Sequence, residues 1–332
     1  MTAGEVLLEA VHVVKHFGMK DRVFGSSRVI HAVDDVSVSL HQGEVLGLVG
    51  ESGCGKSTLS NLFMLLEEPT SGQILFRGQD ISTFSKSEAL AYRRQVQMVF
   101  QDTLGSLDPR MTVTDILTEP FTLHRDFAPK QSWNDHVREL LDRVGLDPDH
   151  ANRYPHEFSG GQRQRICIAR ALALSPSILV CDEPVSALDV SVQAQVVNLL
   201  KDLRDEFGLS YIFVAHDLSV VRQIADVVAV MYLGQIVETG NEDDVLLRPS
   251  HPYTQALVSA LPMSDREGRM TGKRIVLSGD LPSPSDPPSG CRFRTRCWMA
   301  QPRCTSEEPA LIDRGTGRLA ACHFVEPESS VG

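Results

Sequence analysis

Residues 50–58 read GESGCGKST, and this stretch decides the fold of the chain. An apolar run at 45–49 precedes it and predicts a buried strand, whereas residues 59–65 suit a helix. In that setting the backbone N–H groups can surround an anion, and the helix N-terminus adds about half a positive charge. The stretch therefore predicts a phosphate-binding loop, in which Lys56 reaches the β- and γ-phosphates of a nucleotide and the Ser57 hydroxyl ligates Mg²⁺. The spacing G-x-x-x-x-G-K-[ST] is met at Gly50, Gly55, Lys56 and Ser57.

Composition narrows the class of protein around this loop. The 332 residues suggest a large domain plus a smaller one, and 42% hydrophobic residues provide an ordinary core. The net charge of -11 argues against a general nucleic-acid binder. The chain has no long uncharged apolar run, and the start MTAGEVLLEA lacks the basic region of a secretory signal. We therefore expect a cytoplasmic protein whose cysteines stay reduced.

Polar residues follow two later apolar strands. The run at 178–181 leads into Asp182 and Glu183, and carboxylates at the end of a buried strand are costly unless a metal satisfies them. We interpret Asp182 as a Mg²⁺ ligand and Glu183 as the general base that polarises the attacking water. His216 follows a strand at 211–215 and is predicted to contact the γ-phosphate. Turn acids and a structural histidine are the alternatives.

Two later helices begin at polar residues. Ser159-Gly160-Gly161-Gln162 opens a helix predicted to reach Leu174, and a Ser-capped start with open N–H groups can bind an anion. An ordinary capped helix is the alternative. Asp189 precedes a helix over 190–207. The polar stretch 102–158 holds helix-like segments at 113–121 and 133–144 and predicts an inserted helical subdomain.

The N-terminal residues are predicted to form strands at 6–13 and 33–40, with a polar excursion between them. Phe17, or less favourably Phe24, can stack on a nucleobase, and an ordinary core or loop Phe is the alternative. More strands are expected at 72–78, 96–100, 227–232 and 235–238, with Gln101 following the second of these. Because strands alternate with helices, the sequence predicts an α/β core.

These motifs occur in an order that resembles the nucleotide-binding subunit of an ATP-binding cassette (ABC) transporter over residues 5–250. The resemblance implies a P-loop NTPase core with an antiparallel β subdomain and the helical subdomain at 102–158, within a domain at 1–250. A small cysteine-bearing extension would occupy 251–332. Phe158 stands where Leu is common before the signature Ser, and both are apolar.

The resemblance also implies the role of each matched residue, with ATP and Mg²⁺ as cofactors. Nucleotide contacts are expected from Phe17, Gly50, Glu51, Ser52, Gly53, Cys54, Gly55, Lys56, Ser57, Thr58, Ser159, Gly160, Gly161, Gln162 and Asp189. Catalytic roles are expected of Glu183, His216, Lys56 and Gln101, and Mg²⁺ ligation of Ser57, Gln101 and Asp182.

Further motifs resemble the dipeptide/oligopeptide import ATPases, a subfamily that also includes importers of nickel and glutathione. They are VFQD at 99–102, SLDP at 106–109, YPHEF at 154–158, SVQAQ at 191–195 and HPYTQAL at 251–257. The resemblance implies two membrane-spanning permease subunits, a second ATPase chain (identical or a paralogue) and, indirectly, an extracytoplasmic solute-binding protein. It implies a peripheral place on the cytoplasmic face of the inner membrane and no nucleic-acid partner.

Two other classes of protein stay open. A soluble ABC ATPase of DNA repair or translation usually has two cassettes, coiled-coil arms or zinc insertions, and this chain has one cassette. A regulatory subunit that binds ATP without hydrolysing it would lack the acid or the histidine, and both Glu183 and His216 are present.

The tail carries four cysteines after a Pro/Ser-rich linker at 281–290. Cytosolic disulfides are unfavourable, so the candidates are a zinc ion, a [4Fe–4S] cluster or reduced thiols, and the resemblance implies the cluster. The spacing C-x5-C-x6-C-x17-C is formed by Cys291, Cys297, Cys304 and Cys322. Arginines stand nearby and would either offset the charge of a ligated cluster or form a solvated basic loop: Arg292, Arg294, Arg296 and Arg303.

Cys54 lies inside the phosphate loop at a predicted helix N-terminus, where the pKa of a thiol falls. It is therefore either a redox-sensitive thiol or a small residue that fits between two glycines.

Overall fold

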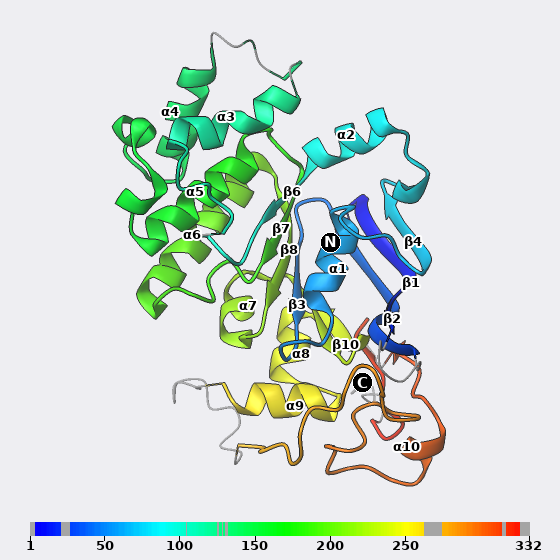
Figure 1. The fold of residues 1–332 in the computed structure, drawn as a ribbon. Coiled ribbons are helices and arrows are strands. Elements are labelled where there is room, and N and C mark those ends of the chain that lie inside the picture. The colour runs from blue at the N-terminus through cyan, green and yellow to red at the C-terminus, as the bar shows by residue number, and fades with distance from the viewer. Residues whose placement is uncertain are drawn as a thin grey trace. The chain divides into compact units, whose positions relative to one another are not determined.

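The structure is a computed structural model that describes residues 4–20, 27–103, 105–124, 126–127, 129, 132–261, 274–313 and 317–325. The chain forms two compact units. Figure 1 shows the chain coloured by residue number. The first unit consists mainly of Thr83–Val214, with His41–Gly43. The second unit consists of Glu5–Leu40, Glu44–Ser82 and the chain from Ala215 onward. The domain boundary expected at residue 250 stays a prediction.

The first unit contains parallel strands in the order β8-β7-β6. Val96 pairs with Ile178 and Ile178 with Ser210 in parallel register. Near-continuous apolar runs are typical of parallel strands that are buried on both faces, and β7 and β8 are buried throughout. The strands expected in this region are confirmed, with bounds β6 Val96–Val99, β7 Ile178–Asp182 and β8 Ser210–Ala215.

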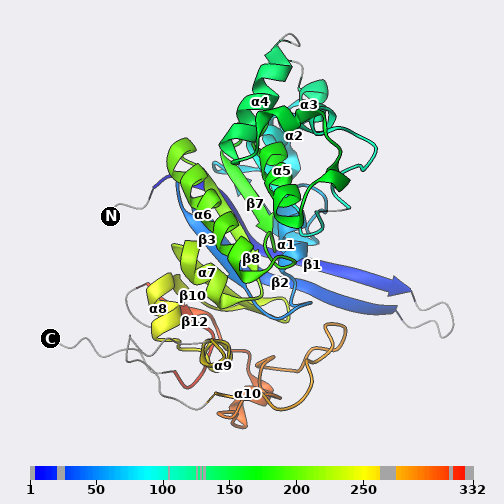
Figure 2. The same cartoon turned by 90° about the vertical axis from the view of Figure 1, so that its left-hand side faces the viewer.

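Helices make up the rest of the first unit, and Figures 1 and 2 show α3, α4 and α5 gathered together. Thr112 and Asp115 form a capping box that starts α3, and Ile116 and Phe121 lie on its buried face. Both helix-like segments of the predicted helical subdomain are confirmed. The bounds are α2 Lys86–Gln95, α3 Val113–Leu123, α4 Trp133–Arg143, α5 Gly160–Leu172 and α6 Val190–Phe207, with short 3-10 turns η3 Pro148–Asn152 and η4 Pro155–Glu157.

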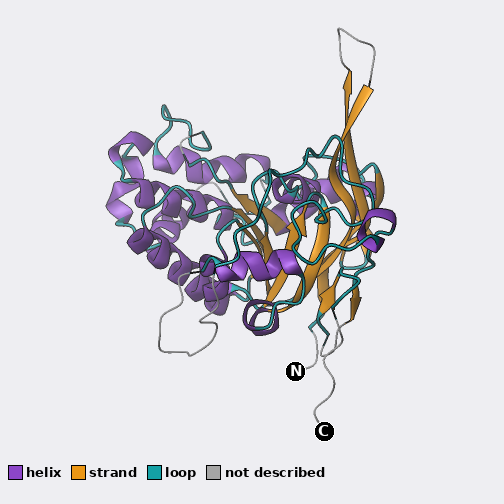
Figure 3. Cartoon of the chain, turned by 90° about the horizontal axis from the view of Figure 1, so that it is seen from below, coloured by secondary structure: helices purple, strands orange, loops and turns teal. Residues whose placement is uncertain are grey.

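The second unit contains a sheet in the order β2-β1-β4-β5, in which β4 pairs antiparallel with β1 and with β5. Figures 2 and 3 show β1 and β2 as a long ribbon. Both strands are longer than the runs at 6–13 and 33–40. The register shifts between Val11 and Val14, and His12 has a positive φ of 49°, so the side-chain alternation is broken within β1. The bounds are β1 Val6–Lys20, β2 Ser27–His41, β4 Ser71–Phe76 and β5 Gln79–Asp80, followed by the 3-10 turn η1 Ile81–Thr83.

A second set of strands in this unit runs in the order β11-β12-β10-β9-β3. β3 pairs with β9 in parallel, β9 and β10 form a hairpin, and the late strand β12 adds antiparallel to β10. The tail of the chain therefore belongs to the layer that holds β3. The bounds are β3 Val45–Val49, β9 Val227–Tyr232, β10 Gln235–Asn241, β11 Ile312–Asp313 and β12 Leu319–Ala320.

Helix α7 packs closely on β3. A Cβ added at Gly47 would lie 2.5 Å from a methyl carbon of Val221, so the approach requires glycine. The helices of this unit are α1 Lys56–Phe63, α7 Leu218–Ile224, α8 Glu242–Leu247, α9 Pro252–Ser259 and α10 Arg303–Ser306. Within the described ranges, the helices all fall short of the length and apolarity that crossing a bilayer requires.

Candidate functional site

The loop between β3 and α1 has a backbone that only glycine allows at two positions. Gly55 has φ of 111°, and a Cβ there would lie 2.0 Å from the Ala32 carbonyl oxygen. A Cβ at Gly50 would lie 2.2 Å from the Met231 carbonyl oxygen. These close approaches hold the loop against β2 and β9, so the predicted loop stands on a rigid base.

Lys56 is the first residue of α1, and its side chain folds back under the loop. It is 4% exposed, and its ammonium donates hydrogen bonds to the carbonyls of Gly50 at 2.7 Å and Glu51 at 3.1 Å. A buried ammonium needs such partners. The lysine therefore lies within the curve of the loop, where the loop N–H groups and the N-terminus of α1 favour phosphate.

Glu51 is held by residues of the C-terminal part of the chain. Its carboxylate accepts from both terminal nitrogens of Arg296, at 2.6 Å and 3.0 Å. Its backbone N–H donates to the Tyr253 hydroxyl at 2.9 Å. Sequence reasoning did not assign these two residues to the site, because a partner about two hundred residues away leaves no local pattern.

Cys54 corrects the expectation of a lowered thiol pKa. The side chain is 1% exposed, and burial raises the pKa of its thiol above the ordinary value, despite the nearby Lys56 ammonium. The prediction of a low pKa was wrong because loss of water outweighs the helix N-terminus. A small residue that fits between Gly53 and Gly55 is the reading that this burial supports.

The remaining loop residues are open to solvent. Ser52 and Ser57 are exposed, and Thr58 is half-buried in the first turn of α1. Phe17 lies in β1 and is half-buried, with the Lys15 ammonium 4.8 Å from its ring centre. The alternative base-stacking residue, Phe24, falls outside the described residues.

In the first unit, β7 brings two acids to its carboxyl end. Asp182 is its last residue and is 7% exposed. Glu183 follows with φ of 45°, and its backbone N–H donates to the Val214 carbonyl at 3.0 Å. The Gln101 amide donates to the Glu183 carboxylate at 3.0 Å. The structure thus brings the predicted general base and Gln101 together.

The signature tetrad forms a capping box at the start of α5. The Ser159 hydroxyl accepts from the Gln162 N–H at 3.3 Å, and the Gln162 side chain accepts from the Ser159 N–H at 2.9 Å. Gly160 and Gly161 begin the helix, and a Cβ at Gly161 would lie 2.6 Å from a methyl carbon of Val192. The predicted Ser cap is confirmed, and its nucleotide contact stays a prediction.

Asp189 and His216 lie at the ends of other elements. The Asp189 carboxylate caps α6 by accepting from the Val192 N–H at 3.0 Å. Hydrogen bonds, first from the Ser191 hydroxyl, hold the pKa of this carboxyl below its usual value, so it stays an anion. His216 directly follows β8 and is exposed. The nucleotide contact of Asp189 and the γ-phosphate contact of His216 stay predictions.

The four tail cysteines lie near one another in the second unit. Cys304 is buried and the other three are half-buried. Burial, with electrostatic repulsion from the three other cysteines, raises the pKa of the Cys291 thiol to about 11. The Cys291 N–H donates to the Cys304 carbonyl at 2.9 Å, so the two ends of the segment 291–304 are joined.

Two of the four neighbouring arginines are largely buried and paired. The side chains of Arg292 and Arg296 are 10% and 9% exposed and pair with Asp34 and Glu51. A solvated basic loop is therefore wrong for these two residues, because ion pairs and packing within the second unit bury them.

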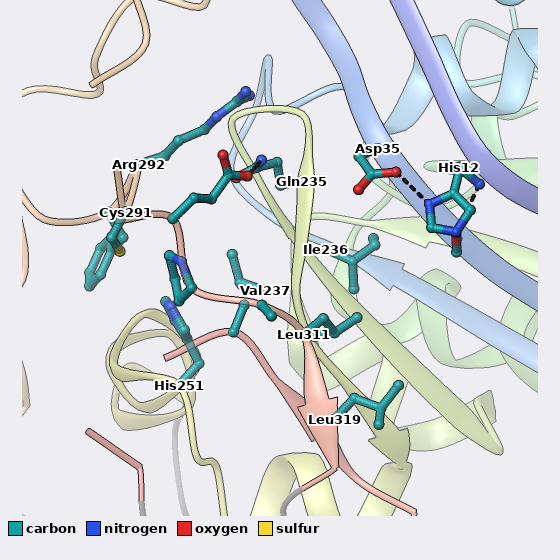
Figure 4. A pocket seen from close by; sticks show the side chains of 16 residues that line it. His12, Asp35, Gln235, Ile236, Val237, His251, Cys291, Arg292, Leu311 and Leu319 are labelled. Atoms are coloured by element: carbon teal, nitrogen blue, oxygen red, sulfur yellow. Dashed lines mark hydrogen bonds and ion pairs between the residues drawn. The ribbon is translucent and has the colours of Figure 1, made fainter. Parts of the chain in front are cut away.

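A cavity of about 610 Å³ is lined in part by residues 291–293 of the tail and by no residue of the phosphate loop. Figure 4 shows its lining side chains, with Cys291 and Arg292 on one side and the His12–Asp35 pair on the other. His251 also lines it, and burial lowers the pKa of that imidazole to about 3. Its walls come from β1, β2, β10 and the tail, and none of its lining residues belongs to the phosphate loop.

Comparison with known proteins matches both parts of the chain. Residues 33–186 match the ABC transporter family, and residues 237–304 match the C-terminal region of oligopeptide/dipeptide transporters. The oligopeptide transport ATP-binding protein AppF of Bacillus subtilis is 51% identical, over 98% of this chain and 99% of AppF. The dipeptide transport ATP-binding protein DppF of Escherichia coli is 47% identical, over 99% of this chain and 97% of DppF.

Solved structures agree on the fold. A dimeric post-hydrolysis ATP-binding cassette bound to ADP and Pi has a TM-score of 0.63 and 28% identity, covering 71% of this chain and 99% of that one. The cassette cbiO1 of Clostridium perfringens, from the ABC transporter complex cbiONQ, has a TM-score of 0.63 and 27% identity, covering 74% and 92%.

Proposed function

The chain belongs to the ATP-binding subunits of oligopeptide and dipeptide ABC transporters, and from this we propose that it hydrolyses ATP to drive peptide uptake. The observation that carries the proposal is the glycine loop that wraps a buried Lys56 between β3 and α1. The peptide itself would pass through a membrane channel made by other chains.

We assign the roles in ATP hydrolysis residue by residue. Lys56 and the loop N–H groups hold the β- and γ-phosphates, and Phe17 stacks on the base. Ser57 and the buried carboxylate of Asp182 offer the oxygen ligands that Mg²⁺ prefers, with help from Gln101. When bound, Mg²⁺ would neutralise charge on the phosphates.

Glu183 acts as the general base in hydrolysis, and His216 contacts the γ-phosphate. The Glu183 carboxylate takes a proton from the attacking water, and the hydrogen bond from Gln101 fixes its direction. We further propose that the signature of a second chain, at Ser159 to Gln162, covers the phosphate loop of the first. Each ATP would then lie between two cassettes.

The partners follow from the same proposal. Two membrane-spanning permease subunits would form the channel, and a second ATPase chain, identical or a paralogue, would complete the pair. A solute-binding protein on the other side of the membrane would deliver the peptide. The chain would sit peripherally on the cytoplasmic face of the membrane, with no nucleic acid in its cycle.

One experiment tests this function. The chain is purified together with the membrane subunits encoded beside it, reconstituted in vesicles, and its ATPase rate is measured with the loaded binding protein. We expect peptides to raise the rate. Stimulation by nickel or glutathione alone would assign another solute of the subfamily, and ATPase activity indifferent to the membrane subunits would remove the transport role.

We propose, in addition, that the four tail cysteines hold an iron–sulfur cluster. A zinc ion with Zn–S bonds of about 2.3 Å would bring four sulfurs within about 3.8 Å of one another. Among the described residues, the metal-ligating atoms that lie that compactly, all within 4.8 Å, are those of His16, His31 and Asp34. The cysteine sulfurs do not meet that limit, which favours a larger group of several metal atoms over a single zinc ion.

That compact set is a poor cation site itself, because Asp34 pairs with the Arg292 guanidinium. For the cysteines, the Met299 N–H donates to the Cys297 sulfur at 3.4 Å, and such hydrogen bonds to sulfur tune iron–sulfur centres. When bound, the cluster would cross-link the tail.

Anaerobic purification tests the cluster. We expect brown protein that contains iron and sulfide, and loss of both after Cys304→Ser. Protein that contains zinc, or no metal, while still supporting transport would remove the cluster.

A further inference from the structure

Arg296 of the cysteine-bearing tail forms a two-pronged ion pair with Glu51 inside the phosphate loop. The two nitrogen–oxygen distances are 2.6 Å and 3.0 Å, and the side chains are 9% and 30% exposed. Parallel hydrogen bonds of this kind fix the direction of a carboxylate as well as its distance.

The backbone of Glu51 is tied to the residue that reaches the phosphates. The Glu51 carbonyl accepts from the Lys56 ammonium at 3.1 Å, and its N–H donates to the Tyr253 hydroxyl at 2.9 Å. Tyr253 is fully buried and packs on Tyr232, with ring centres 4.7 Å apart. A shift of Glu51 therefore shifts a carbonyl that positions Lys56.

A second arginine anchors the far end of the loop. Arg292 donates to the Leu233 carbonyl and to the Asp34 carboxylate. The next residue of that turn, Gly234, donates its N–H to the Cys54 carbonyl at 2.8 Å. The tail thus contacts the phosphate loop directly at one end and through one turn at the other.

We propose that the segment carrying Cys291 and Cys297 is a positioning element for ATP, and that Arg296 sets the phosphate-loop conformation through Glu51. The charge of the pair matters as well as its geometry. Without Arg296, an uncompensated carboxylate would stand in a loop that binds a polyanion, and repulsion would add to the loss of order. Arg296 touches no phosphate in this scheme.

The inference rests on ATP binding by the loop and not on a cluster in the tail. Iron content, measured on the same samples, reports on the cluster separately. Protein without iron would therefore leave the proposed role of Arg296 intact. Likewise, an Arg296 variant with unchanged ATP affinity would leave the proposed cluster intact.

The test measures ATP affinity of the full chain by titration calorimetry. We expect Arg296→Ala to weaken ATP binding about tenfold, with a smaller loss for Arg296→Lys, which keeps the charge but not the fork. Arg303→Ala is the matched control. Like Arg296, Arg303 directly precedes a cysteine and forms an ion pair, with Glu307 at 2.7 Å. Both of these side chains are more than half exposed, and the pair includes no residue of the phosphate loop. The ATP affinity of Arg303→Ala should equal that of the parent chain.

A second variant separates positioning from general damage. Adding Glu51→Gln to Arg296→Ala removes the bare carboxylate, so we expect the double variant to recover part of the lost affinity. In the assembled complex, Arg296→Ala should raise KM for ATP and keep kcat within about twofold. Unchanged affinity in Arg296→Ala, or a double variant no better than the single one, would overturn the proposal. If Arg296→Ala does not fold, the ATP affinity of Arg296→Lys decides: it should be weaker than that of the Arg303→Ala control, and equal affinities would overturn the proposal.

Discussion

Glu183 combines backbone strain with a predicted catalytic role. Its φ of 45° lies in the left-handed region, which residues other than glycine seldom occupy. The structure holds it there through the hydrogen bond from its N–H to Val214 and through Ser186, whose N–H donates to the Glu183 carbonyl at 3.2 Å. Strain that is held by neighbours concentrates at functional positions. The carboxylate then meets Gln101 at 3.0 Å, which directs it.

We predict that Glu183→Gln binds ATP normally but hydrolyses it at least about a hundredfold more slowly, because an amide cannot take a proton from water. The variant should accumulate in an ATP-bound dimer of cassettes. Single-turnover hydrolysis and size-exclusion chromatography with ATP measure the two effects. Normal turnover in the assembled complex would contradict the general-base role.

A pair of glycines in the phosphate loop gives a matched comparison. Gly55→Ala would force a Cβ to 2.0 Å from the Ala32 carbonyl, whereas a Cβ at Gly53, with φ of 79°, meets nothing within 4 Å. We predict that Gly55→Ala abolishes ATP binding and that Gly53→Ala costs only the strain of a left-handed residue, about 1 kcal/mol. ATP titration and thermal unfolding check this. Equal effects of the two changes would show that the close approach does not matter.

At the scale of elements, β10 and α9 are joined through buried polar groups. The Glu238 carboxylate is fully buried and accepts from the N–H groups of Ser250 and His251, at 2.7 Å and 2.8 Å. A carboxylate at this point also favours the N-terminus of α9. The His251 ring caps the helix by accepting from the Tyr253 N–H at 3.1 Å. This junction carries Tyr253, which holds Glu51.

The junction should weaken in acid. Burial lowers the pKa of His251 from 6.5 to about 3, so the folded chain excludes a proton that the unfolded chain binds below pH 6.5. The unfolded state then binds more protons, and the free energy of unfolding falls as pH falls from 6.5 toward 3. At pH 5 the loss from this group is about 2 kcal/mol.

Replacement of the histidine isolates this effect. His251→Asn keeps a capping acceptor without the titration, so its stability deficit relative to the parent chain should shrink by about 2 kcal/mol between pH 7.5 and pH 5. Urea unfolding at both pH values measures the deficit. The exposed His156, changed to Asn, serves as the control and should show no such narrowing. A constant deficit for His251→Asn would contradict the buried neutral imidazole.

At the scale of the whole molecule, the predicted ATP-site residues are divided between the two units. The phosphate loop, Phe17 and His216 belong to the second unit, whereas Gln101 and Glu183 belong to the first. Each unit carries a helix start that is predicted to bind an anion, at α1 and at α5. A chain with both a phosphate loop and a signature, used head to tail with another chain, would supply half of two sites.

We therefore predict that the isolated chain binds ATP but hydrolyses it poorly. Its specific ATPase activity should rise with protein concentration, because the active species is a pair of chains. Serial dilution with a coupled phosphate assay measures this, and the inactive Lys56→Ala chain provides the background. Full activity that is independent of concentration would mean that a single chain completes its own site.

Local sequence determined the phosphate loop, the strands that precede the acids, and the helix at Val190–Phe207, because these depend on spacing and side-chain periodicity between near neighbours. Helix α2 was missed, since KSEALAYRRQ has one buried residue, Tyr92, although Ser85 and Glu88 offered a capping signal. The full length of β1 was missed because the shift near Val11 hides the alternation.

Only the tertiary structure decided the pKa of Cys54 and the surroundings of the tail arginines. The sequence places Cys54 at a helix start, but the folded chain buries it, and its carbonyl accepts from the N–H of Gly234, far along the chain. Arg296 meets Glu51 across 245 residues, a contact that no local pattern encodes. Spacing along the chain therefore determined that a nucleotide is bound, whereas packing between distant segments decided what holds the loop that binds it.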